Sequence, residues 1–141
     1  MKSVLRLRAV EAEFAGLVAF AEEFSRRCSL PDRERSRLLI ILEELFTNAV
    51  RYGRAVGAPD GDVEITLGAK PGRIEIDFSD GGIPFDPLAQ DAPDFDQPLA
   101  AGRSGGGLGL HIVRKLVHEA QYQRERDRNR LKLVRNLAEP G

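Results

Sequence analysis

The stretch VEITLGAKPGRIEIDF, residues 63–78, decides the kind of fold that this chain can form. Apolar residues alternate with polar ones on both sides of a Pro71-Gly72 pair, a pattern typical of two strands that each bury one face. Because proline and glycine favour a tight turn, we expect these strands to form an antiparallel hairpin. The flanking sequence predicts what covers the buried face.

Upstream of the hairpin, the sequence predicts one strand and two helices. Residues 4–9 alternate between apolar and basic side chains and predict an opening strand. Apolar residues then recur at helical spacing from Glu11 to about Cys28. A second helix is predicted to begin near Pro31-Asp32 and to end at Gly53, with its large apolar residues in one continuous arc.

Downstream of the hairpin, periodicity stops over residues 80–104, a stretch rich in Gly, Pro, Asp and Ala. An idle loop in a compact domain rarely exceeds about 12–15 residues, so we interpret this stretch as a mobile lid. Apolar residues from Leu110 to Ala120 predict a third helix, and residues 131–134 predict a last strand paired with residues 122–126. This order predicts an α+β fold, a two-layer sandwich with helices on one face of a mainly antiparallel sheet.

The composition favours one compact domain over residues 1–141, with 42% hydrophobic residues. Its 21 basic and 22 acidic residues give a net charge of -1, which argues against broad binding to nucleic acid or to an anionic membrane. Basic residues interrupt the first residues, and no apolar run reaches the roughly 18 residues of a membrane span, so we expect a cytoplasmic protein. Cys28 is the only cysteine, which excludes an internal disulfide.

The second predicted helix carries a carboxylate and an amide one turn apart. At about 100° per residue, Glu44 and Asn48 lie about 40° apart at the boundary of the apolar arc, whereas Glu43 points to the opposite flank. The oxygen of an asparagine amide can ligate Mg²⁺, and a glutamate can accept a proton from an attacking hydroxyl or position a water. An ordinary i, i+4 pair on the wet side of the helix is the alternative.

Asp80 closes the second strand of the hairpin and precedes Gly81-Gly82. A carboxylate at a strand end, beside closely approaching backbone, can accept a hydrogen bond from an exocyclic amine such as that of adenine. Turn chemistry without a ligand is the alternative.

A glycine run, Gly105-Gly106-Gly107-Leu108-Gly109, precedes the third predicted helix. Backbone N–H groups at a helix N-terminus can bind phosphates where no side chain blocks them, and Arg103 could reach a terminal phosphate. No Gly-Lys-Ser or Gly-Lys-Thr follows, so the run is not a P-loop. A merely flexible loop with a solvated arginine remains the alternative. The arginine-rich run of residues 124–130 alternates with acids and is interpreted as a solvated hairpin edge.

Taken together and in this order, the three motifs resemble the GHKL ATP-binding superfamily of gyrase, the Hsp90 chaperones, histidine kinases and MutL. The stretch from Glu44 to Asn48 resembles its asparagine box, Asp80 to Pro87 its first glycine box, and Gly105 to Leu110 its second. The resemblance continues through residues 111–117 into the last strand. Within the superfamily, the chain looks most like the anti-sigma factor serine kinases of bacterial partner-switching systems.

The resemblance implies the histidine-kinase-like ATPase fold, ATP and Mg²⁺ as cofactors, and a lid at about residues 81–106. By position it implies Glu44 as the catalytic carboxylate, Asn48 as the Mg²⁺ ligand and Asp80 as the residue that recognises adenine. Further nucleotide-binding positions are Gly82, Arg103, Gly105, Gly107, Leu108 and Gly109. The pair Arg128-Asn129 stands where relatives often have Gly-Asn or Gly-Thr before the last strand.

The resemblance also implies a homodimer that sequesters a sigma factor and phosphorylates a serine on a STAS-domain antagonist, with no direct nucleic-acid or membrane partner. The alternative function is a nucleotide-dependent binding module that regulates another signalling pathway without phosphorylating anything.

Overall fold

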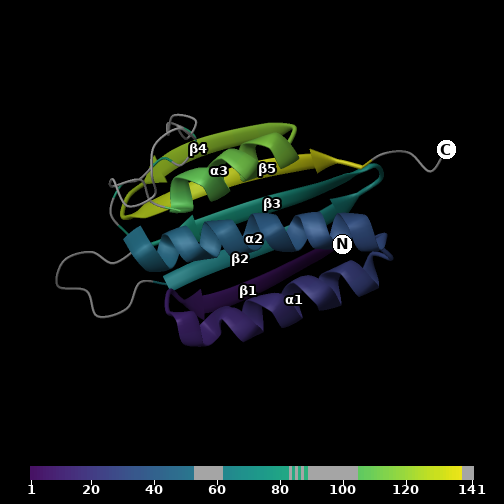
Figure 1. The fold of residues 1–141 in the computed structure, drawn as a ribbon, viewed down its shortest axis with the longest axis horizontal. Helices are drawn as coiled ribbons and strands as arrows, with labels where there is room; N and C mark the ends of the chain where they lie inside the picture. Colours follow the sequence, from purple (N-terminus) through teal and green to yellow (C-terminus); the bar gives the residue numbers. More distant parts are fainter. Residues whose placement is uncertain (53–61, 83, 85, 87, 89–104, 138–141) are drawn as a thin grey trace.

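A five-stranded antiparallel sheet carries helices on one face in the computed structural model (Figure 1). The structure describes residues 1–52, 62–82, 84, 86, 88 and 105–137, and for residues 52 and 105–110 it describes the backbone alone. The strands are β1 (Lys2–Arg8), β2 (Asp62–Lys70), β3 (Arg73–Asp80), β4 (Glu119–Glu125) and β5 (Arg128–Asn136). The helices are the short 3-10 turn η1 (Glu11–Glu13), α1 (Phe14–Arg27), α2 (Asp32–Tyr52) and α3 (Gly105–Leu116).

The predicted hairpin is confirmed as β2 and β3, which lie in the interior of a sheet with strand order β1-β2-β3-β5-β4. Ile65 pairs with Phe78 and Leu67 with Ile76, so the apolar residues of both strands share one face. Gly72 closes the turn with a φ of 78°, a backbone conformation that glycine adopts without steric cost. The α+β architecture predicted from the sequence is therefore correct.

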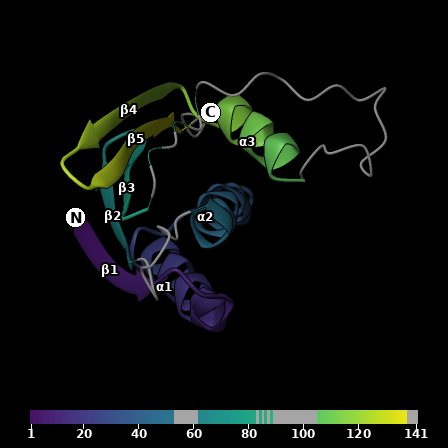
Figure 2. The same ribbon diagram turned by 90° about the vertical axis from the view of Figure 1, so that its left-hand side faces the viewer.

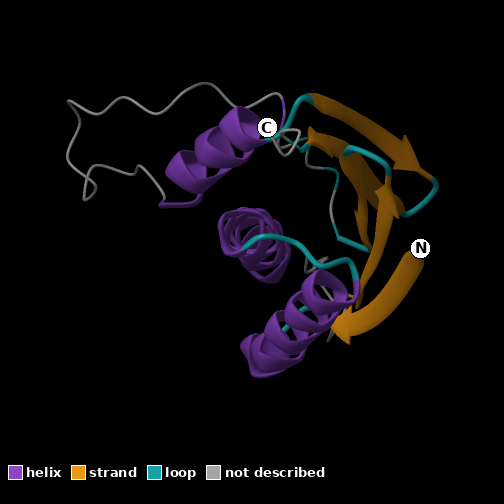
Figure 3. Ribbon diagram, turned by 90° about the vertical axis from the view of Figure 1, so that its right-hand side faces the viewer, coloured by secondary structure: helices purple, strands orange, loops and turns teal. Residues whose placement is uncertain are grey.

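The core lies between the sheet and the helices. Figures 2 and 3 show α2 between α1 and α3, all on the same side of the curved sheet, while the opposite face is uncovered. The apolar arc predicted for the second helix faces this core. Val50, at the end of the arc, is partly buried, and the other residues are at most 4% exposed: Leu38, Ile41, Leu42, Leu45, Phe46 and Ala49. Burial of this stripe, more than helix propensity, holds α2 on the sheet.

The third helix differs from the prediction at both ends, because it begins at Gly105 and ends at Leu116. Beyond Leu116 the chain turns, the backbone N–H of His118 donates to the carbonyl of Val134, and Ala120 pairs with Leu133 in the sheet. Sheet pairing with β5 thus competes with continuation of the helix. An apolar spacing of three and four residues cannot reveal this competition, since it depends on a strand that lies later in the chain.

The lid predicted at residues 81–106 falls largely outside the described residues, as does Arg103. Among its described positions, Asp86 accepts a hydrogen bond from the backbone of Leu88 at 2.8 Å, and Leu88 packs against the core. Within the part of the chain that the structure describes, no helix is long and apolar enough to cross a membrane.

A partly buried ion pair joins the two layers at the end of the molecule where α2 begins. Arg135 donates to both carboxylate oxygens of Glu34, at 2.7 and 3.2 Å, and also to the carbonyl of Leu116, the last residue of α3. The side chains of Arg135 and Glu34 are 12% and 10% exposed. One guanidinium therefore links β5, the first turn of α2 and the end of α3.

We predict that Arg135→Met lowers the free energy of unfolding by about 3 kcal/mol, because it leaves the Glu34 carboxylate in a nearly dry position with Arg37 as its remaining partner. Urea denaturation measures this change. Hydrogen bonding to Arg135 is the main cause that lowers the pKa of Glu34, so the stabilisation is present above the ordinary glutamate pKa and is lost as the pH falls through the lowered value. The difference in free energy of unfolding between wild type and Arg135→Met should therefore become smaller as the pH is lowered.

The matched control is Arg26→Met, which breaks an exposed pair with Glu23 on α1 and should change the free energy of unfolding far less. Equal losses in the two variants would contradict the role given to Arg135.

Candidate functional site

Three helix and strand ends and one turn lie together at the end of the molecule opposite this ion pair. The end of α2, the end of β3, the start of α3 and the turn between β4 and β5 all lie on the left of Figure 1. The three motifs singled out in the sequence are carried by α2, β3 and α3. The fold therefore brings these motifs to one end of the two-layer structure.

The amide of Asn48 is buried on α2, with the residue 6% exposed. Its nitrogen donates to the backbone carbonyl of Glu44 at 2.7 Å, one helical turn earlier. This bond fixes the amide and leaves its oxygen as the acceptor that the side chain can offer to a ligand. Because the bond ends on the backbone, the carboxylate of Glu44 is not held by Asn48.

The carboxylate of Glu44 is half-buried, as expected for the boundary of the apolar arc. Burial raises the pKa of Glu44, and the neighbouring Glu43 carboxylate raises it further, against a smaller opposing effect of Arg51. A raised pKa makes an ionised carboxylate a stronger proton acceptor near neutral pH. Glu44 is therefore suited to general-base chemistry.

Asp80 organises the turn that follows β3. One of its carboxylate oxygens, Oδ1, accepts from the backbone N–H of Gly82 at 3.0 Å and from the amide nitrogen of Asn129 at 3.1 Å. Gly82 is buried, and a Cβ added to Gly81 would lie 3.0 Å from an oxygen of Asp62. A side chain at this position would require the exposed Asp62 carboxylate to shift.

The glycine run lies inside α3, and the prediction that it precedes the helix was wrong. Gly105, Gly107, Leu108 and Gly109 belong to the first turns of the helix. The first N–H groups of a helix have no intrahelical partner and carry the positive end of its dipole. These backbone groups can thus bind an anion from within the helix.

The sequence analysis missed the contribution of β4. Arg124 donates to the carbonyl of Gly82 at 2.8 Å, and Tyr122 and Arg124 both donate to the amide oxygen of Asn129. The interpretation of residues 124–130 as a solvated edge was therefore wrong for Arg124. Strand alternation contained the signal, because Arg124 follows Tyr122 by two residues and so lies on the same face of the sheet.

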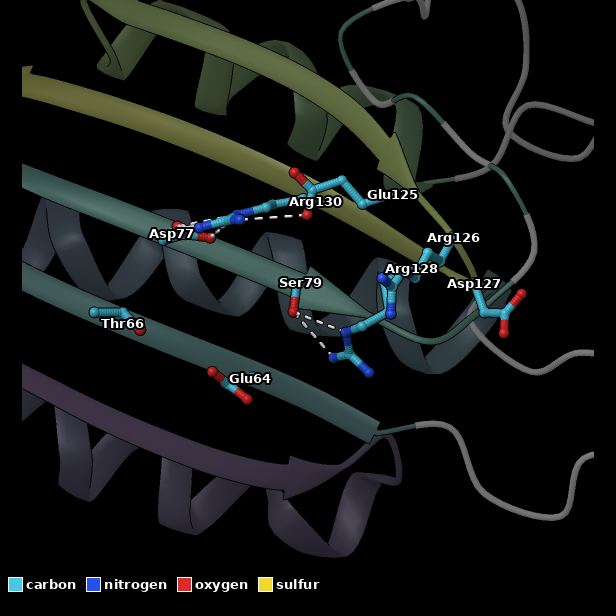
Figure 4. Close-up of a pocket in the computed structure, with 9 residues that line it drawn as sticks. All are labelled: Glu64, Thr66, Asp77, Ser79, Glu125, Arg126, Asp127, Arg128 and Arg130. Atoms are coloured by element: carbon cyan, nitrogen blue, oxygen red, sulfur yellow. Dashed lines mark hydrogen bonds and ion pairs between the residues drawn. The ribbon is translucent and has the colours of Figure 1, made fainter.

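The same arginine-rich run also lines a groove of about 840 Å³ on the uncovered face of the sheet (Figure 4). There Arg130 pairs with Asp77 at 2.7 Å and with Glu125 at 3.3 Å, while Arg128 pairs with Asp62 at 2.8 Å and donates to Ser79. These cations are neutralised by neighbouring acids. The groove is a poor candidate for an anionic ligand.

The described residues contain no group of three or more His, Cys, Asp or Glu side chains that could hold a metal ion. They therefore give little support for a metal site built from side chains alone. Mg²⁺ usually keeps several waters and takes most of its remaining ligands from phosphates. A single buried amide oxygen at Asn48 fits that mode of binding.

Comparison with known families gives a match over nearly the whole chain. The histidine kinase-like ATPase domain family matches residues 7–135. These residues run from the end of β1 to the last-but-one residue of β5, and they include all elements of the candidate site.

Individual relatives come from several kinds of protein. A phytochrome of Mougeotia scalaris is 35% identical over 104 residues, which are 68% of this chain and 9% of the phytochrome. The serine/threonine-protein kinase BtrW of Bordetella bronchiseptica is 27% identical over 106 residues, 75% of this chain and 73% of BtrW. The serine-protein kinase RsbW of Bacillus licheniformis is 32% identical over 91 residues, 61% of this chain and 55% of RsbW.

Among solved structures, the RsbU and RsbW domains of a Mycobacterium tuberculosis protein match 100% of this chain and 34% of that chain, with a TM-score of 0.71 and 16% identity. At this identity the match shows a shared fold.

We predict that a carboxyl NMR titration places the pKa of Glu44 above the ordinary glutamate value and that Glu43→Gln lowers it, because the like charge next to it is removed. Burial is the larger cause and remains, so the pKa of Glu44 should stay above the ordinary value in this variant. The matched control is Glu22→Gln on the exposed side of α1, which should leave the titration unchanged. An unchanged or higher pKa in Glu43→Gln would contradict the assignment.

Proposed function

The chain belongs to the histidine kinase-like ATPase domain family, and from this membership we propose that it is an ATP-dependent protein-serine kinase and anti-sigma factor. In this proposal it phosphorylates a STAS-domain antagonist and sequesters a sigma factor. Glu44 and Asn48 carry the proposal, because a carboxylate of raised pKa lies one turn from a buried amide whose orientation is fixed.

Each element at this end of the molecule has a task in the proposed reaction. Asp80 accepts a hydrogen bond from the exocyclic amine of adenine, and Gly82 lines the base pocket. The backbone N–H groups of Gly105, Gly107, Leu108 and Gly109 bind the phosphates at the start of α3. Asn48 ligates Mg²⁺, which when bound neutralises charge on the phosphates. Arg103 is proposed to contact the terminal phosphate.

Glu44 acts as the general base of the proposed transfer. One of its carboxylate oxygens takes the proton of the incoming serine hydroxyl while the serine oxygen bonds to the terminal phosphorus and the bond to the leaving ADP oxygen breaks. The half-buried position supports this role, since partial desolvation of the carboxylate favours proton uptake.

The relatives BtrW and RsbW, which are named as serine/threonine- and serine-protein kinases, support a serine as the acceptor. The proposed partners are a STAS-domain antagonist, a sigma factor and a second copy of this chain, and the proposed location is the cytoplasm, where Mg-ATP and sigma factors occur. Neither nucleic acid nor membrane is a proposed partner, in keeping with the net charge of -1.

We predict that wild-type protein, incubated with Mg-ATP and the STAS-domain protein encoded nearest to it, adds one phosphate to a serine of that protein, as measured by intact mass. Glu44→Gln should bind ATP normally but transfer phosphate at least about a hundredfold more slowly, because the proton acceptor is lost. Glu43→Gln, on the same helix, keeps the proton acceptor and only lowers the pKa of Glu44, so it should retain most of the transfer.

If wild type and Glu44→Gln both bind ATP and neither transfers phosphate to any such candidate, the kinase function is wrong. The chain would then be a nucleotide-dependent binding module.

A second prediction concerns the metal. Asn48→Ala should weaken ATP binding by about tenfold in the presence of Mg²⁺ and much less in excess EDTA, because only the metal-bound form uses the amide oxygen. Calorimetry under both conditions measures the difference, with the exposed neighbour Thr47→Ala as control. An equal loss of affinity with and without Mg²⁺ would remove Asn48 from the metal site, whereas melting curves report any general loss of fold.

A further inference from the structure

The edge strand β4 reaches the candidate base pocket through three linked side chains. Tyr122 donates its hydroxyl proton to Oδ1 of Asn129 at 2.5 Å, and Nη1 of Arg124 donates to the same oxygen at 3.2 Å. Nδ2 of Asn129 then donates to Oδ1 of Asp80 at 3.1 Å. We call these three residues the relay: Tyr122, Arg124 and Asn129.

The relay fixes which way the amide of Asn129 faces. A guanidinium can only donate hydrogen bonds, so the atom of Asn129 next to Arg124 must be the amide oxygen. The amide nitrogen is thereby turned towards Asp80. Asn129 is 6% exposed, and a flip would place two donors against each other in a nearly dry site.

The orientation of Asn129 in turn decides what Asp80 can offer. Oδ1 of Asp80 meets two N–H donors, Nδ2 of Asn129 and the backbone of Gly82, and must accept from both. No donor among the described residues is bonded to Oδ2. Asp80 therefore keeps a second oxygen, Oδ2, which an ionised carboxylate offers to a ligand as an acceptor.

Arg124 also holds the turn itself. The Nη1 atom that contacts Asn129 lies 2.8 Å from the carbonyl of Gly82, so one guanidinium fixes both the amide and the backbone that follows Asp80. Gly82 cannot move away from Asp80 without breaking this bond. The acceptor is thus held in position as well as in orientation.

We propose that the relay selects 6-amino over 6-oxo purine nucleotides by holding Asp80 as a hydrogen-bond acceptor. An adenine presents a donor at its six position, whereas hypoxanthine or guanine presents a carbonyl oxygen that faces Asp80 acceptor to acceptor. Tyr122 and Arg124 act through Asn129 and Gly82 and are positioning residues. This inference rests on the nucleotide site of the proposed function.

Calorimetry with Mg-ATP and Mg-ITP tests the proposal, because the two nucleotides differ only at the six position and the adjacent ring nitrogen. The quantity measured is the ratio of the two dissociation constants. If the relay only stabilised the fold, its loss would weaken the binding of both nucleotides equally and leave this ratio unchanged.

Asn129→Asp is the sharpest variant, since it places a carboxylate oxygen against Oδ1 of Asp80. Two carboxylates at hydrogen-bond distance cannot both stay ionised, so the pair takes up a proton, and no amide donor then holds Asp80 as an acceptor. We expect the preference for ATP over ITP to fall at least about tenfold. Tyr122→Phe and Arg124→Met each remove one donor to Asn129 and should lower the preference roughly two- to tenfold.

Arg124→Lys keeps a donor and should retain more of the preference than Arg124→Met. The matched control is Lys132→Met, which removes an exposed cation of β5 paired opposite Asp77, and it should leave the ratio unchanged. Melting curves show whether each variant folds. If the other variants do not fold, the ratio measured for the isosteric Tyr122→Phe decides the question.

An unchanged ratio in folded Asn129→Asp and Tyr122→Phe would overturn the proposal and leave the proposed function standing. Equal wild-type affinity for ATP and ITP would also overturn it. Failure of the wild type to bind either nucleotide would instead overturn the proposed function and this inference with it.

Discussion

The ion pair between Arg135 and Glu34 fixes how the sheet and the helices, which the apolar core holds together, meet at one end of the molecule. It is the place where the sheet, the first turn of α2 and the end of α3 are held by a single side chain. The covered face of β5 therefore begins with a polar residue, Asn129, continues with buried leucines and ends with Arg135. One end of this strand belongs to the candidate site, and the other anchors the helices that carry its remaining parts.

Local periodicity was sufficient to predict much of this structure. The alternation in residues 63–78 and the arc of α2 record which side chains face the core, so the hairpin, the helix layer and the boundary position of Glu44 followed from spacing alone. The end of α3 did not follow, because it depends on pairing with β5, a contact between distant parts of the chain that leaves no periodic signal in the helix itself. Alternation does place Arg124 on the same face as Tyr122, but it does not reveal the partner of Arg124, the carbonyl of Gly82, which lies far away in the chain.

The two faces of the β4–β5 hairpin explain why one arginine-rich run has two different roles. Arg124 lies on the covered face with Tyr122 and binds the turn after β3, whereas Arg128 and Arg130 lie on the uncovered face, where acids neutralise them. Exposed pairs of the second kind add little stability. Their effect is to keep an uncovered sheet face polar, which disfavours non-specific association through it.

The two ends of α3 are held very differently. Its last carbonyl is bound by Arg135, while its first turns are rich in glycine, which costs about 0.8–1.0 kcal/mol per residue relative to alanine in a helix interior. The glycine-rich first turns are therefore the end from which α3 opens at lower cost in free energy, whereas opening of the last turn also breaks the contact with Arg135.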